Sequence, residues 1–359
     1  MQAPFCQNGG LTIIPLPGFL NLAENLKKHI ESMSERPAYE QTPVDIAVPE
    51  FKLWPSGETY VELSNTHICG HDCVIVGSGP GTDAMIMKLL WTIGHAAGRH
   101  ARRISVVTGY FPQSRSDADE GEKILTLLPM VMAMATVQAG DVGIHRWICA
   151  DPHCKQLPQA GKSGKITPIY LTRRLLTFAL SQASVDEGRR NVLAFPDHTA
   201  KKRYDPAIKF MRTTRGIVLP TVTAFKERED ARHTEVITMV GALDQVREAR
   251  VLMFDDEIAT GGSVIDMARR LKEEYGAHSV WACATHGVLC GDAKNRFLVD
   301  PEHRIVNQII VTDTIPVKSR LDGIVELVDT GIITVYSWLE DLAWVIIRNH
   351  WDMGVREIR

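Results

Sequence analysis

Residues 251–263 read VLMFDDEIATGGS, and this stretch decides how the rest of the chain is interpreted. Val251 to Phe254 are four consecutive apolar residues, which is typical of a parallel strand buried on both faces. Two carboxylates, Asp255 and Asp256, follow at the end of that strand, and a turn with two glycines follows them. Apolar residues then recur at helical spacing, and Ser263 is expected to be the N-cap of the helix.

The turn from Thr260 to Ser263 has the composition of a phosphate-binding loop. Glycine lets the backbone approach a ligand closely and adopt positive φ, and the N-terminus of a helix favours an anion. Because like charges repel, we expect Asp255 and Asp256 to hold sugar hydroxyls or a metal ion rather than a phosphate. The helix should stop near Gly276. A strand-to-helix turn with incidental acidic residues is the alternative.

The composition is that of an ordinary globular protein. The chain has 359 residues, enough for two domains. Its net charge of −3 gives no cationic excess for binding nucleic acid. No apolar run reaches the roughly 18 residues of a membrane span, and the first residues lack the features of a signal peptide. We therefore expect a cytoplasmic protein with no membrane partner. Seven scattered cysteines argue against a disulfide framework.

Strand and helix patterns alternate along both halves of the chain, which predicts α/β domains with largely parallel sheets. A long loop is expected at 33–50, and a hairpin at 51–63, where Pro-Ser-Gly forms the turn. Residues 158–166 are expected to connect the two halves. Other strands are expected at 11–15, 73–78, 103–111, 144–157 and 309–317. One more strand is expected to begin at 191, and another is expected in 213–230, where a mobile loop follows it. Helices are expected at 20–32, 124–140 and 168–183, and in the stretch that ends at residue 98.

The stretch 251–263 resembles the 5-phosphoribosyl 1-diphosphate (PRPP) loop of type I phosphoribosyltransferases and PRPP synthetases. The next predicted strand, VWACATHGVLCG at 280–291, carries the ATHG that PRPP synthetases have. Further segments resemble that family in the family's order, from about residue 11 onward. The chain is identified on these motifs as a divergent member of the ribose-phosphate diphosphokinase (PRPP synthetase) family.

This resemblance implies two type I phosphoribosyltransferase-like domains with largely parallel sheets, related by a pseudo-twofold. It places the active site between them, at the carboxyl ends of strands. The expected limits are 1–165 for an N-terminal domain on the ATP side, 166–335 for a second domain with the PRPP and catalytic loops, and 336–359 for a C-terminal helix that packs back on the first domain. The family also implies a homo-oligomer built from dimers, such as a hexamer.

Three segments of the first half resemble the family's ATP site. The hairpin at 51–63, which in the family reaches a neighbouring subunit, has Ser56 where the family has aspartate. A segment after the strand at 103–111 is acidic beyond Asp117, where the family is basic. Local packing of the hairpin's Trp54 and a solvated acidic loop are the alternatives. The residues that the resemblance assigns to ATP are Trp54, Ser56, Glu58, Arg115, Asp117 and His153.

Magnesium is the metal that the resemblance implies, held by His153, Asp197, Asp255 and Asp256. His153 would be structural without the resemblance, since magnesium prefers oxygen ligands. A zinc site in the alternating His/Cys run at 67–73 is disfavoured, because four ligands on one face of an extended segment rarely converge on one ion.

Lys226 and Arg228 match the family's K-x-R on the catalytic loop. Two cations two residues apart in an extended chain point to the same side and could meet one polyphosphate. A solvated charge run is the alternative. The resemblance also assigns the acceptor's phosphate to a loop that consists of Ala259, Thr260, Gly261, Gly262 and Ser263. Ala259 replaces the family's aspartate in this loop, and Ser263 replaces its final threonine.

The activity that the resemblance implies is Mg-dependent transfer of the diphosphoryl group of ATP to the anomeric hydroxyl of ribose 5-phosphate, giving PRPP and AMP for nucleotide biosynthesis. Three alternatives stay open. The first is the same chemistry on a larger ester such as ADP-ribose, because Ala259 removes a carboxylate and some volume. The second is a non-catalytic regulatory paralogue. The third is a phosphoribosyltransferase that consumes PRPP, which would leave the ATP-side motifs unexplained.

Overall fold

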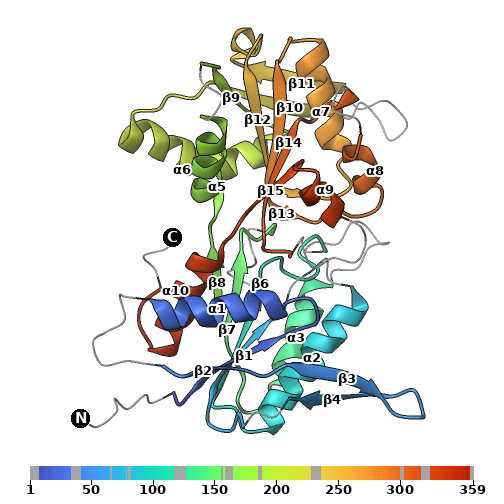
Figure 1. Ribbon diagram of the computed structural model, residues 1–359, viewed down its shortest axis with the longest axis vertical. Helices are drawn as coiled ribbons and strands as arrows, with labels where there is room; N and C mark the ends of the chain where they lie inside the picture. The colour runs from blue at the N-terminus through green and yellow to red at the C-terminus, as the bar shows by residue number, and fades with distance from the viewer. Residues whose placement is uncertain are drawn as a thin grey trace. The chain divides into compact units, whose positions relative to one another are not determined.

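The computed structural model describes residues 8–33, 42–64, 67–77, 79, 82–116, 127–154, 157, 165–184, 188–227, 236–299, 303–316 and 324–355. The chain forms two compact units, each described here by itself (Figure 1). Unit 1 comprises Met1–Tyr170, Thr314–Ser319 and Trp338–Arg359, and unit 2 comprises Leu171–Asp313 and Arg320–Ser337. No helix in the described ranges is long and apolar enough to cross a membrane.

Unit 1 is built on a six-stranded sheet of order β2-β1-β5-β6-β7-β8, in which every neighbouring pair is parallel. Strands β1 and β5 are buried along their whole length, as expected for a parallel sheet covered on both faces. Helix α1 packs against α10, and α2 packs against α3. The strands are β1 Leu11–Pro15, β2 Val44–Ile46, β5 Asp72–Val76, β6 Arg103–Thr108, β7 Ile144–Ala150 and β8 Ile166–Ile169; the helices are α1 Leu20–Ser32, α2 Asp83–Gly98, α3 Leu128–Gln138 and α10 Leu339–His350.

A separate antiparallel hairpin, β3 (Pro49–Leu53) with β4 (Thr59–Leu63), extends from the body of unit 1 (Figure 1). The turn is closed by backbone hydrogen bonds between Trp54 and Glu58 and between Gly57 and Trp54, at 2.8 Å each. This hairpin was predicted from the sequence and is confirmed.

Unit 2 is built on a seven-stranded sheet of order β11-β10-β9-β12-β13-β14-β15. All its neighbouring pairs are parallel except β10 with β11. The strands are β9 Asn191–Phe195, β10 Thr221–Glu227, β11 Val236–Gly241, β12 Arg250–Ile258, β13 Ser279–Gly287, β14 Gln308–Thr312 and β15 Ile333–Tyr336; the helices are α5 Thr172–Ala183, α6 His198–Arg215, α7 Gly262–Glu273, α8 Ala293–Phe297 and α9 Val325–Asp329, with a 3-10 turn at Leu243–Gln245.

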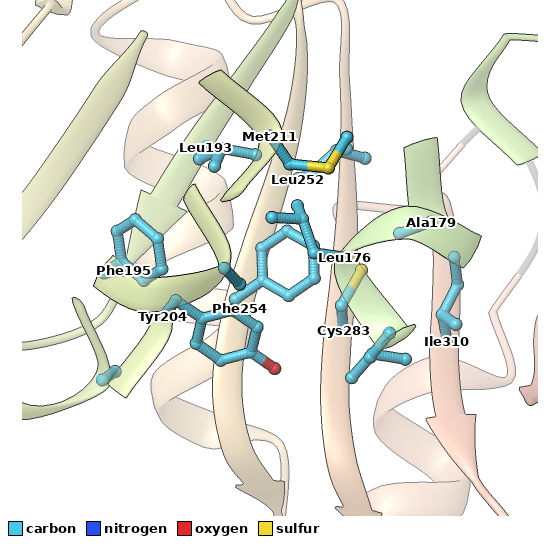
Figure 2. Close-up of a cluster of buried hydrophobic side chains, with 13 residues drawn as sticks. Leu176, Ala179, Leu193, Phe195, Tyr204, Met211, Leu252, Phe254, Cys283 and Ile310 are labelled. Atoms are coloured by element: carbon cyan, nitrogen blue, oxygen red, sulfur yellow. The ribbon is translucent and has the colours of Figure 1, made fainter. Parts of the chain in front are cut away.

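The core on one face of this sheet joins α5 and α6 to four central strands (Figure 2). The rings of Tyr204 and Phe254 lie 4.8 Å apart between centroids, and Phe195 packs beside both. Since alternate residues of a strand share a face, Phe254 on the α6 side places Asp256 on that side as well. The core therefore fixes the direction of one of the two carboxylates that follow it.

Several sequence predictions are confirmed and three need correction. The strand at 11–15 and the helix at 20–32 have the predicted limits. The predicted loop at 33–50 contains β2 and the start of β3. The predicted helix at 168–183 begins only at Thr172, because residues up to Ile169 form β8, an edge strand in which Pro168 is tolerated. The strand expected before a mobile loop in 213–230 is β10, which begins only at Thr221 and extends to Glu227, while residues 213–215 still belong to α6.

A buried polar cluster joins α10 to the sheet of unit 1. The Asp72 carboxylate, fully buried at the start of β5, accepts a hydrogen bond from Arg103 on β6 and pairs with Nδ1 of His350 at 3.1 Å. Arg103 also donates to the carbonyls of Asn349 and His350 and pairs with Asp352. Asn349 in turn accepts from Nε of Arg146 at 2.6 Å. Residues nearly 280 positions apart thus share one ion-pair network.

Candidate active site

Strand β12 and helix α7 form the strand, turn and helix that the stretch at 251–263 predicts. The strand extends to Ile258, so Asp255 and Asp256 lie within it rather than after it. The helix begins at Gly262, and its N-cap is Gly261, which has φ of 78°. Ser263 was predicted as the N-cap, and that prediction is wrong. Glycine adopts this left-handed conformation without the steric penalty of a side chain, so it sets where the helix begins.

The two glycines of the turn let neighbouring side chains pack directly on its backbone. A Cβ added at Gly261 would lie 2.5 Å from the ring of Phe297, and one added at Gly262 would lie 2.7 Å from Nη1 of Arg296. The first N–H groups of a helix have no partner within the helix. A turn with this geometry can hold an anion by its backbone, next to the guanidinium of Arg296.

Neighbouring strand ends hold the turn in place. The N–H of Leu289 donates to the carbonyl of Ile258 at 2.9 Å, and that of Cys290 donates to the carbonyl of Ala259 at 3.1 Å. Both donors follow β13, whose ATHG at 284–287 runs parallel to β12. His286 of that motif is buried, and its backbone forms an isolated antiparallel β-bridge with Asp313, the residue after β14. The carboxyl ends of these strands therefore meet at one edge of the sheet.

The two acidic residues of β12 have different electrostatic surroundings. Burial raises the pKa of Asp255 well above its ordinary range, and the charges of Asp256 and Asp197 raise it further. Asp256 instead pairs with Nη2 of Arg203 at 3.3 Å. The Asp255 side chain accepts from the N–H of Asp256 at 2.8 Å. Asp256 is thus the carboxylate whose charge is balanced by an arginine. A bound cation or a hydroxyl donor would stabilise the ionised form of Asp255.

Asp197 lies at the end of β9, the strand next to β12, and is the N-cap of α6. Its carboxylate accepts from the N–H of Ala200 at 2.7 Å. Arg203, on the same helix, reaches Asp256. Unit 2 therefore brings together at one sheet edge the predicted phosphate turn and the acidic residues Asp197, Asp255 and Asp256.

Substitution of Gly261 tests the turn. Gly261→Ala is expected to raise the KM for a phosphorylated acceptor at least about tenfold, because a Cβ there meets the Phe297 ring and the positive φ becomes strained. Steady-state kinetics measure this, and the thermal midpoint reports any loss of fold. Gly276→Ala, at φ of 70° with no contact closer than 3.7 Å, is the control for strain alone. An unchanged KM in Gly261→Ala would contradict the assignment of the turn.

The cationic pair predicted for catalysis is only partly described. Lys226 belongs to β10, where its backbone pairs with Ile237 of β11, and Arg228 lies outside the described residues. The role of both residues therefore stays a prediction.

In unit 1, the predicted adenine-binding residues occupy the tip of the β3–β4 hairpin. The Trp54 ring stacks on Tyr60 with 4.3 Å between ring centroids, yet Trp54 remains 54% exposed. The Ser56 hydroxyl donates to Glu58 at 2.8 Å. The hairpin packs Trp54 locally, as the alternative interpretation expected, and still leaves a large part of the indole accessible to a ligand.

The other predicted ATP residues of unit 1 follow neighbouring parallel strands. Arg115 is exposed after β6, and His153 is half-buried after β7. Between this histidine and the strand lies Asp151, buried with φ of 29°, whose N–H donates to the carbonyl of Ile169. Asp117 lies outside the described residues.

The predicted magnesium ligands are compatible with that ion, although the described part of the chain holds no group of three or more His, Cys, Asp or Glu side chains placed to bind a metal. Asp255 and Asp256 supply carboxylate oxygens, which magnesium prefers, on adjacent residues at the sheet edge. A substrate polyphosphate would have to complete such a site, as is common for magnesium.

Sequence analysis missed three contacts of this site. The pairing of Arg203 with Asp256 was not considered. Arg296 and Phe297, which pack on the glycines of the turn, were not considered. Their position in the sequence was a usable signal, since α8 follows the strand next to β12 and adjacent parallel strands end at the same sheet edge.

Two family models match the chain: the N-terminal domain of ribose phosphate pyrophosphokinase at residues 19–140 and the phosphoribosyl synthetase-associated domain at residues 201–334. A ribose-phosphate pyrophosphokinase from Rhodopirellula baltica is 29% identical over 342 residues, which are 94% of this chain and 95% of that protein. One from Campylobacter jejuni is 27% identical over 284 residues, 76% of this chain and 81% of that protein.

Among solved structures, phosphoribosylpyrophosphate synthetase from Mycobacterium smegmatis has the same fold. Its TM-score is 0.72 at 21% identity, and the match covers 96% of this chain and 99% of that one. The fold is therefore α/β with largely parallel sheets of the type I phosphoribosyltransferase kind, as the sequence predicts.

Proposed function

Since the chain belongs to the ribose-phosphate diphosphokinase (PRPP synthetase) family, we propose that it transfers the diphosphoryl group of ATP to the anomeric hydroxyl of ribose 5-phosphate. The products are PRPP and AMP. The observation that carries this proposal is the turn at Gly261 and Gly262, a backbone anion site beside the carboxylates of Asp255 and Asp256.

Each part of the sheet edge in unit 2 has a role in this reaction. The backbone from Ala259 to Ser263 holds the acceptor's 5-phosphate, and Asp255 and Asp256 orient its ribose hydroxyls. Lys226 and Arg228 stabilise the charge that develops as the bond to AMP breaks. Such a transfer depends on positioning and charge neutralisation, so no residue needs to act as a nucleophile.

The residues for ATP come from unit 1. Trp54 stacks on the adenine, and Ser56, Glu58, Arg115, Asp117 and His153 contact the rest of the nucleotide. Magnesium, when bound, neutralises charge on the polyphosphate oxygens. His153 and Asp197 would hold it on the ATP side, and Asp255 and Asp256 on the acceptor side.

The proposed organisation follows the same division. Residues 1–165 form the ATP-side domain, 166–335 the domain with the PRPP and catalytic loops, and 336–359 the C-terminal segment that packs on the first. A cytoplasmic homo-oligomer built from dimers completes the proposal.

Asp197→Asn is expected to weaken ATP binding about tenfold in magnesium and to leave it unchanged in EDTA. The amide keeps an oxygen to cap α6 through the N–H of Ala200, so the helix start is preserved while the charge is lost. Isothermal titration of a non-reactive ATP analogue, with and without magnesium, measures both. An equal loss in EDTA would show that Asp197 acts only in the fold.

One assay tests the function directly: ATP, magnesium and ribose 5-phosphate are mixed with the protein, and AMP release is followed. AMP formed in step with PRPP is the expected result. No AMP from this mixture, together with release of pyrophosphate when PRPP and a nucleobase are supplied instead, would indicate a phosphoribosyltransferase. Nucleotide binding with no turnover of any acceptor would indicate a regulatory paralogue.

A larger ribose 5-phosphate ester, such as ADP-ribose, is the second candidate acceptor. Ala259 supports it, because this position at the mouth of the turn carries no carboxylate to repel further phosphate charge. Ribose 5-phosphate stays first, since a free phosphate dianion gains most from a backbone anion site.

A further inference from the structure

A cavity of about 360 Å³ lies in unit 2 beside the phosphate turn, whose Gly262 lines it. Its wall is one face of α7, on which Gly262, Ile265, Asp266 and Arg269 recur at helical spacing. The opposite wall includes Arg296 and Phe297 of α8. A volume of this size is within the range of small-molecule sites, and Gly262 is the residue proposed above for the acceptor that lines it.

The cavity and the phosphate turn share a residue and a cation. Gly262 belongs to both. A Cβ placed on it would be 2.7 Å from Nη1 of Arg296 and 3.9 Å from Oγ1 of Thr260, so guanidinium and hydroxyl flank the same point of the backbone. Arg296 therefore lies beside the turn and also lines the cavity.

The polar groups of the cavity suit a ligand with both phosphate and hydroxyl groups. Arg269 pairs with Asp266 and Arg296 with Asp292, each through one contact of 3.6 Å between exposed side chains. Exposed pairs of this kind contribute little, and each guanidinium has five N–H donors. Both arginines can thus donate to a phosphate, while Asp266 can accept from a ribose hydroxyl.

Apart from His303, the rest of the lining is apolar. Ile265 and Phe297 line the wall, and Val306 closes it from the segment that precedes β14. Phe297 and Val306 are themselves buried. An apolar wall next to two guanidinium groups, one carboxylate and the imidazole of His303 matches a nucleoside joined to a phosphate.

We propose that this cavity binds the outer part of an extended acceptor, namely the second phosphate and nucleoside of a ribose 5-phosphate ester whose inner phosphate occupies the turn. The inference rests on the proposed function for the turn. In this arrangement Arg296 contacts both phosphates of the ester. Arg269 contacts only the outer phosphate and therefore determines specificity for the extended acceptor.

Two adjacent arginines of α7 provide a matched test. Arg269 lines the cavity, whereas Arg270 pairs with Glu274 at 2.7 Å and does not line it. Arg269→Ala and Arg270→Ala remove the same charge from the same helix. Kd values for ADP-ribose and for ribose 5-phosphate are measured by isothermal titration, with α,β-methylene-ATP and magnesium present so that the ATP site is occupied and no transfer occurs.

Arg269→Ala is expected to raise the Kd for ADP-ribose about tenfold, the loss of one charge-assisted contact, and to leave the Kd for ribose 5-phosphate within about twofold. Arg296→Ala is expected to weaken both ligands, and Arg270→Ala neither. Saturating ribose 5-phosphate is expected to abolish ADP-ribose binding, because both occupy the turn.

Equal effects of Arg269→Ala and Arg270→Ala on ADP-ribose would overturn the inference. So would ADP-ribose binding that persists at saturating ribose 5-phosphate, since the cavity would then hold a separate molecule. Absence of AMP release from the unmodified protein would instead reject the proposed function, and it leaves these binding measurements interpretable.

Discussion

Lys226→Ala and Arg228→Ala are each expected to lower kcat about 100-fold or more, with a smaller change in KM, as the loss of a preorganised charge donor does. The two residues are two positions apart in the sequence, so in an extended segment both side chains face the same side. The leaving AMP oxygen and the transferred diphosphoryl group gain charge only as the bond breaks. Cations that meet this charge therefore stabilise the transition state more than the bound substrates.

Lys209→Ala is the matched control, because Lys209 is an exposed lysine of α6 in the same unit. Steady-state kinetics of AMP release, with both substrates varied, separate kcat from KM. If both loop variants kept a near-normal kcat, the solvated charge run would be the correct interpretation of these residues.

Asp72→Ala is expected to lower the free energy of unfolding by about 3 kcal/mol or more, as the loss of one partner of a buried ion pair does. The variant leaves Arg103, which is 11% exposed, and the buried His350 without the carboxylate they share. Asp352→Ala removes another carboxylate from the same guanidinium, but this one is 41% exposed, so a cost below about 1 kcal/mol is expected. Urea unfolding of the two variants and the unmodified chain measures the difference. Equal losses of unfolding free energy in the two variants would show that the buried ion pair stabilises the fold no more than the exposed one.

The effect of Asp72 also has a predictable pH dependence. Burial alone would raise the pKa of Asp72, but the hydrogen bond from His350 and the charge and hydrogen bond of Arg103 together hold it below its ordinary value of 3.8. A carboxyl whose folded pKa is lowered contributes its full stability above the unfolded pKa and loses it as the pH falls through the folded pKa. The gap between the unmodified chain and Asp72→Ala is therefore expected to be constant above about pH 5 and to narrow below pH 4. A constant gap down to pH 2 would contradict this.

The central strands and the phosphate turn were predictable because their signals are local. Apolar runs such as Val251–Phe254 mark buried parallel strands, and the helix at 20–32 has a clear apolar face. The edge strands β2 and β8 were missed, since short strands flanked by or containing proline resemble loops in sequence. Site residues could be predicted where they lie close together in one segment, as in 255–263.

Contacts between segments far apart in the chain could not be predicted from the sequence. Nothing local links Asp72 to His350, or the glycines of the turn to Arg296 and Phe297. The N-cap was misplaced for a related reason: a serine is the commoner cap, but the packing of Phe297 on Gly261 decides where the backbone turns. Such choices depend on tertiary packing rather than on propensity.

The return of α10 to unit 1 has a consequence for biosynthesis. Domains generally fold as they leave the ribosome, the earlier ones first. Here, residues 171–337 are made before α10, which at common translation rates takes roughly 10–30 s. During that interval the surface of α1 that packs on α10 lacks its cover, and the Asp72–Arg103 pair lacks His350. The nascent chain is therefore most prone to aggregate through the unit whose synthesis began first, and a chaperone would be expected to act there.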